Sequence, residues 1–373
     1  MKYILRQTAL TLLSFAFLYV VLGSVSFIVF PDPASGGPRD FQAADRTLYM
    51  TVPKYVVLGR SALDNSDRKV VLVGASNTSV GFRQKLIQPS LSCAKVSNVA
   101  MGGANISEVQ QVIGLVHEVQ NDHDRGSNTF VIGIWFGMFV DSDVKYADAD
   151  RHRGETDVDI ERYRYGFYRR TSDGPVAVLP SKWLDGGVMA LRPFLLFEKL
   201  AREARAGVNL VLTRRTTAQR TDEERESVVM SEAEKQKALE YWKESMGRKS
   251  EISSAQVELL KETIETLLNG GEKVVLADLP IPAWHRDASP YQRGYSKALN
   301  LLLQRFGDRP NFTSMSMDDL DDNLDYSDEV HAKRHLAEVW SARLAAVLDS
   351  FVCQDNVEKP PKTALQSGYG RPQ

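Results

Sequence analysis

The three residue types of a serine catalytic triad occur in two short motifs, one near each end of the globular part of this chain. Residues 74–78 read Gly-Ala-Ser-Asn-Thr after an apolar run, and residues 328–331 read Asp-Glu-Val-His. A serine hydroxyl is a weak nucleophile at neutral pH unless a base lies within hydrogen-bond distance and a third group orients that base. The order Ser76, Asp328, His331 therefore predicts nucleophilic catalysis by Ser76, with His331 as the base and Asp328 as its orienting group.

Each motif alone also has a purely structural interpretation. Serine and asparagine after a strand are common helix N-caps, and Ser327 or Asp328 could cap the last helix in the same way. Residues 74–78 also differ from the Gly-x-Ser-x-Gly nucleophile elbow, because Thr78 replaces the second glycine. His335, one helical turn after His331, is expected at the surface. The catalytic interpretation depends on the combination of the two motifs.

A glycine-containing segment at 98–105 follows the second predicted strand. Glycine lets the backbone approach a ligand closely and direct N–H groups at a developing oxyanion. We expect Gly103 and the backbone of Asn77 to be the oxyanion donors, and Asn105 to bind substrate. The alternative is a tight turn without a ligand.

Five short apolar runs alternate with amphipathic helical patterns. This alternation predicts an α/β fold with a doubly wound, five-stranded parallel sheet, whose ligands bind beyond the carboxyl ends of the strands. The predicted strands are 69–73, 94–99, 129–135, 273–277 and 312–317, and the predicted helices are 106–119, 255–268, 295–306 and 332–351. Trp284 and His285 follow the fourth strand, where they would line the cleft or form a packed loop.

The alternation lapses between about 146 and 250, which predicts a helical insertion. Helices are expected at 189–206, starting near Pro193, and at 231–246. The insertion is either a lid or partner surface, or a peripheral structural elaboration. The remaining segments are predicted as a juxtamembrane linker at 31–66, one domain at 67–351, and a flexible tail at 352–373.

The N-terminus predicts a membrane anchor. Residues 8–30 carry no charge, and about 23 residues give a helix of about 34 Å, long enough to cross a bilayer. Lys2 and Arg6 precede this run, so residues 1–30 are expected to form an uncleaved signal anchor with a cytoplasmic N-terminus. Cleavage near residues 23–26 is the alternative.

Composition argues against nucleic-acid and zinc binding, and it leaves open whether the two cysteines are bonded. The formal net charge of -2 gives no support to a nucleic-acid partner. No Cys/His cluster has zinc spacing, so neither a metal nor a cofactor is expected. Cys93 and Cys353 either form a disulfide bond or remain two separate thiols.

The conjunction of motifs resembles the SGNH (GDSL-like) hydrolase family, over roughly residues 67–351 apart from the insertion. Ser76 matches its nucleophile block, Gly103 its oxyanion glycine, and Asp328 with His331 its terminal Asp-x-x-His block. The family's Gly-x-Asn-Asp block is absent, because residues 133–136 read Gly-Ile-Trp-Phe. The resemblance implies a three-layer sandwich around a five-stranded parallel sheet. Trp135, Trp284 and His285 are then expected to bind substrate.

The N-terminal anchor and the missing asparagine are similar to the membrane-anchored branch of that family, which acts in envelope O-acyl transfer. This similarity implies an esterase or O-acyltransferase on the outer side of a bacterial cytoplasmic membrane. Its substrate would be an acylated glycan or a small acyl ester, and its partner a membrane acyltransferase. The alternatives are a degenerate domain that binds glycan or scaffolds an envelope complex, and a lipid or thioester hydrolase.

Overall fold

The structure is a computed structural model that describes residues 1–30, 48–49, 51–59, 68–120, 126–147, 151–152, 154–172, 174–213 and 222–353. Its strands are β1 (Lys69–Gly74), β2 (Lys95–Asn98), β3 (Thr129–Ile134), β4 (Tyr168–Thr171), β5 (Gly174–Ala177), β6 (Lys273–Asp278) and β7 (Phe312–Ser316). Its helices up to the insertion are α1 (Lys2–Val29), α2 (Val52–Leu58), α3 (Ser76–Gly81), α4 (Gln84–Ile87), α5 (Ile106–Val119), α6 (Ser142–Lys145) and α7 (Asp157–Arg164). The later helices are α8 (Ser181–Thr213), α9 (Asp222–Glu226), α10 (Glu232–Ser245), α11 (Ser254–Asn269), α12 (Ala283–Ala288), α13 (Gln292–Phe306) and α14 (Arg334–Leu348).

The main sheet has five parallel strands in the order β2-β1-β3-β6-β7. All residues of β1 and β3 are buried, as expected for central strands covered on both faces. The predicted five-stranded parallel sheet is therefore confirmed, with strand ends within two residues of the predicted ones. Its carboxyl edge brings the residues that follow β1, β2, β3 and β6 to one side of the molecule.

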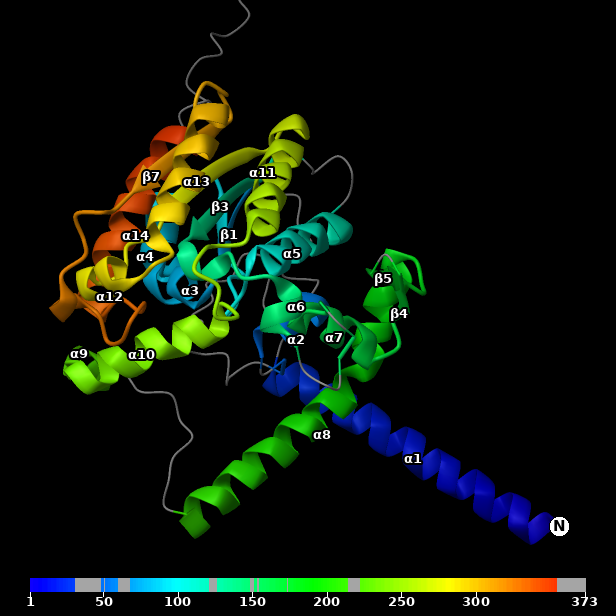
Figure 1. Cartoon of the computed structure of the whole chain (residues 1–373). Helices are drawn as coiled ribbons and strands as arrows, with labels where there is room; N and C mark the ends of the chain where they lie inside the picture. The colour runs from blue at the N-terminus through cyan, green and yellow to red at the C-terminus, as the bar shows by residue number, and fades with distance from the viewer. Residues whose placement is uncertain are drawn as a thin grey trace, which may run out of the picture.

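Helices cover both faces of this sheet, which makes it doubly wound (Figure 1). Alternate residues of β1 point to opposite faces, so Val71 and Val73 contribute to one core and Val70 and Leu72 to the other. The first core also contains buried side chains of α5, α11 and α13, and the second contains Phe82, which follows α3, and buried side chains of α4 and α14. The three layers place the loops at the strand ends on a rigid support.

One part of the predicted linker belongs to the core. Helix α2 buries Tyr55, Val56, Val57 and Leu58 and packs against α7 and α5. Its apolar run covers a surface that would otherwise be exposed, so treating all of 31–66 as a linker was wrong. The predicted segments 31–47 and 60–67 lie outside the described residues.

The insertion is largely helical, as predicted, but its first helix is longer than expected. Helix α8 begins at Ser181 and runs through Pro193, whereas the sequence placed its start near that proline. Leu184 and Val188 before the proline and Leu195 after it are all buried in the same core. Burial on both sides of Pro193 holds the helix together despite the missing backbone N–H.

A disulfide bond joins Cys93, which precedes β2, to Cys353, which lies beyond α14. The two Cα atoms are 5.6 Å apart. The bond settles the alternative that the sequence left open, and it ties the end of the described domain to the edge strand of the sheet. The predicted tail beyond Cys353 lies outside the described residues.

Candidate active site

Ser76, His331 and Asp328 form one hydrogen-bonded chain. His331 Nε2 lies 2.8 Å from Ser76 Oγ, and His331 Nδ1 lies 2.7 Å from Asp328 Oδ2. Ser76 is half-buried at the first position of α3, so its hydroxyl is within reach of a substrate. The sequence placed these residues 255 positions apart, and the fold brings them into direct contact.

The loop that carries Asp328 and His331 is held by several backbone contacts. Asp328 Oδ1 accepts hydrogen bonds from the backbone N–H groups of Val330 and His331, at 3.0 and 2.8 Å. An isolated bridge pairs Tyr326 with Ala332 on either side of the motif. The backbone around His331 is therefore held in one conformation by contacts within its own loop.

Neither motif serves as a helix cap. The N-cap residue of α3 is Ala75, and that of α14 is Lys333, and neither makes a side-chain capping bond. The side chain of Asp328 caps its own loop instead, and that of Ser76 faces His331. The structural interpretation of both motifs is therefore wrong.

The electrostatics of the pair favour an ionised Asp328. Burial acts to raise the pKa of this carboxyl. The hydrogen bond and charge of His331, together with the two backbone donors, outweigh it and hold the pKa below the ordinary value of 3.8. An aspartate that stays negative at neutral pH can hold the Nδ1 proton of His331 and stabilise the imidazolium formed when Ser76 loses its proton.

His335 is not part of this arrangement. Its two ring nitrogens lie 2.9 Å from Glu226 of α9 and 2.9 Å from Asp325. Hydrogen bonding to Asp325, followed by Glu226, raises its pKa despite some desolvation. The expectation that His335 is an exposed histidine outside the triad is confirmed.

The turn that begins α3 depends on two glycines. A Cβ added to Gly74 would lie 2.1 Å from Thr78 Oγ1, and one added to Gly133 would lie 2.3 Å from the same oxygen. Thr78 is fully buried and its hydroxyl points at the Gly133 carbonyl, 3.4 Å away. Thr78 therefore fills the space above two neighbouring strand ends, which explains why threonine is tolerated where an elbow motif has glycine.

The predicted oxyanion donors lie at the same edge of the sheet. The backbone N–H of Met101, in the turn after β2, donates to the Gly74 carbonyl at 2.9 Å, which joins this turn to the end of β1. Gly103 is exposed in that turn with a φ of 69°, and a Cβ there would meet nothing within 4 Å. Asn77 is buried in the first turn of α3, where backbone N–H groups have no partner within the helix. Asn77 is thus adjacent to Ser76 in the chain, and the turn that carries Gly103 is joined to the strand end that precedes Ser76.

Asn105 has a different role from the predicted one. Its Oδ1 caps α5 by accepting from the N–H of Glu108, and its Nδ2 donates to the Val140 carbonyl and to Ser142 Oγ. The side chain is fully buried. Because its polar atoms are already used and no part of it is exposed, the prediction that Asn105 binds substrate was wrong.

The three other predicted substrate residues belong to an aromatic cluster beside the loop that carries Asp328 and His331. This aromatic cluster consists of Trp135, Phe136, Trp242, Trp284 and His285. Trp135 contacts Trp242 edge-on at 4.7 Å between ring centroids, and Trp284 stacks on His285 at 5.2 Å. Only Trp242 and Trp284 are partly exposed, whereas Trp135 and His285 are buried. In this conformation Trp135 and His285 therefore form the buried part of the cluster and are not exposed to solvent.

His285 connects the aromatic cluster to the loop that carries Asp328 and His331. Its Nδ1 lies 2.8 Å from the carbonyl oxygen of Glu329, the residue after Asp328. A carbonyl oxygen only accepts, so Nδ1 must carry the proton. Burial lowers the pKa of His285 to about 4, which leaves the ring neutral at physiological pH. His285 therefore acts as a rigid, uncharged support for the loop that carries Asp328 and His331.

Sequence analysis missed Trp242, which lies on α10 of the insertion. Its Nε1 donates to Glu329 Oε1 at 3.4 Å, and its ring covers Trp135. Lys235, two turns earlier on α10, lies 6.0 Å from the ring of Trp284. A single tryptophan in an otherwise polar helix was the available signal. The insertion thus contacts the loop that carries Asp328 and His331 directly.

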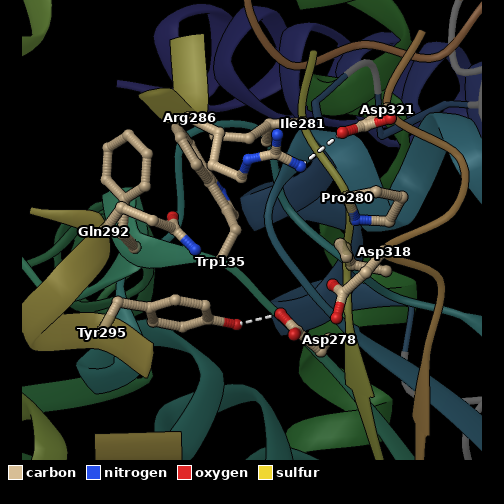
Figure 2. Close-up of a pocket in the computed structure, with 11 residues that line it drawn as sticks. Trp135, Asp278, Pro280, Ile281, Arg286, Gln292, Tyr295, Asp318 and Asp321 are labelled. Carbon is tan, nitrogen blue, oxygen red and sulfur yellow. Dashed lines mark hydrogen bonds and ion pairs between the residues drawn. The ribbon is translucent and has the colours of Figure 1, made fainter. Parts of the chain in front are cut away.

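A cavity of about 30 Å³ opens on the other side of Trp135, at the ends of β6 and β7 (Figure 2). Within it Tyr295 donates to Asp278, and Arg286 pairs with Asp321. Burial raises the pKa of Asp278 to about 7, although the Tyr295 hydrogen bond opposes this. A cavity of this size holds about one or two waters, so it is too small for a sugar ring.

Among the described residues, no group of three or more His, Cys, Asp or Glu side chains is arranged to hold a metal ion. The chain matches none of the known protein-family models, and no curated protein matches it either.

Proposed function

We propose that this protein is a serine esterase or O-acyltransferase that forms an acyl-enzyme on Ser76. The observation that carries the proposal is the continuous chain from Ser76 Oγ through His331 to Asp328, with contacts of 2.8 and 2.7 Å. Nucleophile, base and orienting group lie at hydrogen-bond distance in the geometry that serine catalysis requires.

The reaction has two halves. His331 Nε2 takes the proton of Ser76 as Oγ attacks the acyl carbonyl, and the backbone N–H groups of Gly103 and Asn77 would stabilise the oxyanion. His331 then returns the proton to the leaving alkoxide, and the acyl group stays on Ser76. In the second half His331 deprotonates water or a hydroxyl group, which attacks the acyl-serine and frees Ser76.

The resemblance to SGNH hydrolases supports this chemistry and suggests its setting. Asparagine of the family's third block would be replaced by Trp135, so the oxyanion would rely on backbone donors. Loss of one donor costs about 10²–10³ in rate, so we expect the acyl chemistry to be slow with any acceptor. From the resemblance we propose acyl esters of an envelope polysaccharide as the substrate class, with a membrane acyltransferase as partner.

We place the domain outside the cytoplasmic membrane of a bacterium. Helix α1 is long and apolar enough to span a membrane, and Lys2 and Arg6 precede its uncharged run. The bond between Cys93 and Cys353 supports an oxidising compartment. A phosphatase reporter that folds only outside the cytoplasm, fused after Gln373, should be active. An inactive fusion would contradict this topology.

A non-catalytic domain that binds glycan is the second candidate. It is favoured by one observation, the burial of Trp135 where the family has an oxyanion donor. This candidate predicts an intact fold that does not react with acylating probes. The two candidates therefore differ in the reactivity of Ser76.

The deciding experiment is labelling of the full-length protein in detergent with a fluorophosphonate, which reacts with activated serines. We expect the wild type to be labelled and Ser76→Ala to be unlabelled. Ser79→Ala is the matched control, because Ser79 is on the same helix and half-buried like Ser76. Absence of labelling in the wild type, or equal labelling of Ser76→Ala, would overturn the catalytic proposal.

A further inference from the structure

Helix α8 has two apolar faces, and only one of them is covered. Leu184, Val188 and Leu195 are buried in the core. Large apolar side chains on the opposite side of the helix are exposed to solvent: Trp183 by 71%, Phe194 by 59%, Phe197 by 70% and Leu200 by 51%. A helical face that exposes this much aromatic surface normally meets a membrane or another protein.

Arg192 holds α8, and with it this exposed face, against α1. Arg192 is buried between the two helices, where its guanidinium donates to Ser26 Oγ at 3.2 Å, to the Ser26 carbonyl at 3.0 Å, and to the Phe30 carbonyl. The same guanidinium lies 4.0 Å from the ring centroid of Phe27. Arg192 thus pairs with the last carbonyl groups of α1 and fastens α8 to that end of the helix.

The contacts between the two helices also determine at which point along α1 the helix α8 lies. The ring of Phe194 meets the ring of Tyr19 edge-on at 6.0 Å. Leu22 of α1 and Phe30, which follows α1, pack against the core of the domain, so the exposed part of α1 before Leu22 is left to span a bilayer, rather than the whole uncharged run 8–30. About 20 residues from Tyr3 to Leu22 are enough to cross the hydrocarbon layer, with Arg6 near the inner boundary, where its long side chain reaches the headgroups, and Tyr19 near the outer one. Tyrosine is enriched at that boundary. Phe194 therefore lies at the level of the outer headgroups when α1 spans the bilayer.

We infer that α8 is a second membrane contact, lying at the outer membrane surface with Trp183, Phe194, Phe197 and Leu200 in the lipid. The occupant is lipid because this face continues the exposed surface of α1 through the Tyr19–Phe194 contact. Figure 1 shows α1 and α8 together below the sheet, both projecting away from it. Exposed Arg202 and Arg205 on α8 add positive charge for anionic headgroups. The inference does not depend on the chemistry of Ser76.

Depth measurement with a spin label tests the inference. The two native cysteines are bonded to each other, so a nitroxide attaches only to an introduced cysteine. The full-length protein would carry the label at Phe197→Cys, at Leu12→Cys within α1, or at Leu301→Cys on α13. All three replaced side chains are more than half exposed, so the substitutions remove little packing. Each variant is placed in nanodiscs of phosphatidylethanolamine and phosphatidylglycerol, with one copy per disc and, in a second preparation, with two.

The measured quantity is the ratio of collision rates with oxygen, which concentrates in lipid, and with a nickel chelate, which stays in water. We expect the ratio at position 197 to exceed that at position 301 by about threefold or more, and to approach the value at position 12. A ratio at 197 equal to that at 301 would overturn the inference. A high ratio only in discs with two copies, with dipolar broadening between labels, would show a dimer interface instead. A low ratio at position 12 would show that α1 does not span the membrane, and the inference would fall with it.

Discussion

Replacing Asp328 by asparagine is the sharpest test of the catalytic arrangement. The variant keeps the side-chain oxygen that accepts from the backbone N–H groups of Val330 and His331, so the loop should keep its shape. It loses the negative charge beside the His331 ring, whose Nδ1 lies 2.7 Å from Oδ2. The effect on rate therefore reports the electrostatic contribution of Asp328 rather than a change in the fold.

The size of the effect follows from the geometry. Charge centres about 4 Å apart attract by about 4 kcal/mol at an effective dielectric constant of about 20. Loss of this stabilisation in the transition state lowers the rate by about 10³, and an asparagine amide facing Nδ1 would add to the loss by favouring the wrong tautomer. We expect a decrease of about 10³–10⁴.

The assay is the rate of fluorophosphonate labelling of the full-length protein, checked by hydrolysis of a short p-nitrophenyl ester. Asp325→Asn is the matched control, because Asp325 contacts His335 at 2.9 Å as Asp328 contacts His331, but lies outside the triad. The control should stay within about twofold of the wild type, since it leaves the transition state untouched. A labelling rate of Asp328→Asn within tenfold of wild type, or an equal loss in the control, would refute the assignment.

Three further predictions concern stability, each measured by thermal unfolding of the full-length protein in detergent. Burial raises the pKa of Asp278 to about 7 from 3.8, so the contribution of Asp278 to the free energy of unfolding falls by at most about 4 kcal/mol as the pH rises from 4 to 7. Asp278→Asn should lose this pH dependence, and a pH profile unchanged from the wild type would contradict the prediction. Burial lowers the pKa of His285 to about 4 from 6.5, so the free energy of unfolding of the wild type should fall by at most about 3 kcal/mol as the pH drops from 6.5 to 4. His285→Gln should make this decrease in acid smaller. A decrease as large as that of the wild type would count against a buried neutral ring. The bond between Cys93 and Cys353 closes a segment spanning 260 positions, so reduction should lower the free energy of unfolding by up to about 5 kcal/mol, whereas a variant with serine at both positions should be insensitive to the reductant.

The sheet and the triad could be predicted because both leave local signals. A central parallel strand is buried on both faces, so runs such as Val70–Val73 are continuously apolar. The strand order then brings the residues after β1 to the carboxyl edge. The same rule placed Ser76 and Gly103 at one edge. Only the contact with His331, which comes from a loop near the end of the chain, needed the structure.

The features that the sequence did not predict depend on long-range packing. The apolar pattern of α2 is compatible with either a linker helix or a core helix, and its contact with α7 decides between them. The sequence around Asn105 has the composition of a ligand-binding turn, yet the Asn105 side chain is hydrogen-bonded to the N–H of Glu108 and to the Val140 carbonyl. The role of Trp242 depends on where the insertion folds back. No local propensity contains that information.

The insertion contacts two separate parts of the molecule, the apolar N-terminal helix and the loop that carries Asp328 and His331. Its first long helix, α8, is fastened to the end of α1 by Arg192, and its last helix, α10, reaches Glu329 through Trp242. Glu329 in turn holds His285 through its carbonyl oxygen and precedes His331 by two positions. A segment that interrupts an otherwise regular α/β pattern thus links the apolar N-terminal helix to the loop that carries Asp328 and His331. If α1 spans a bilayer, these contacts hold Ser76 in a fixed orientation to the membrane, which is what the proposed acyl transfer at the membrane surface requires.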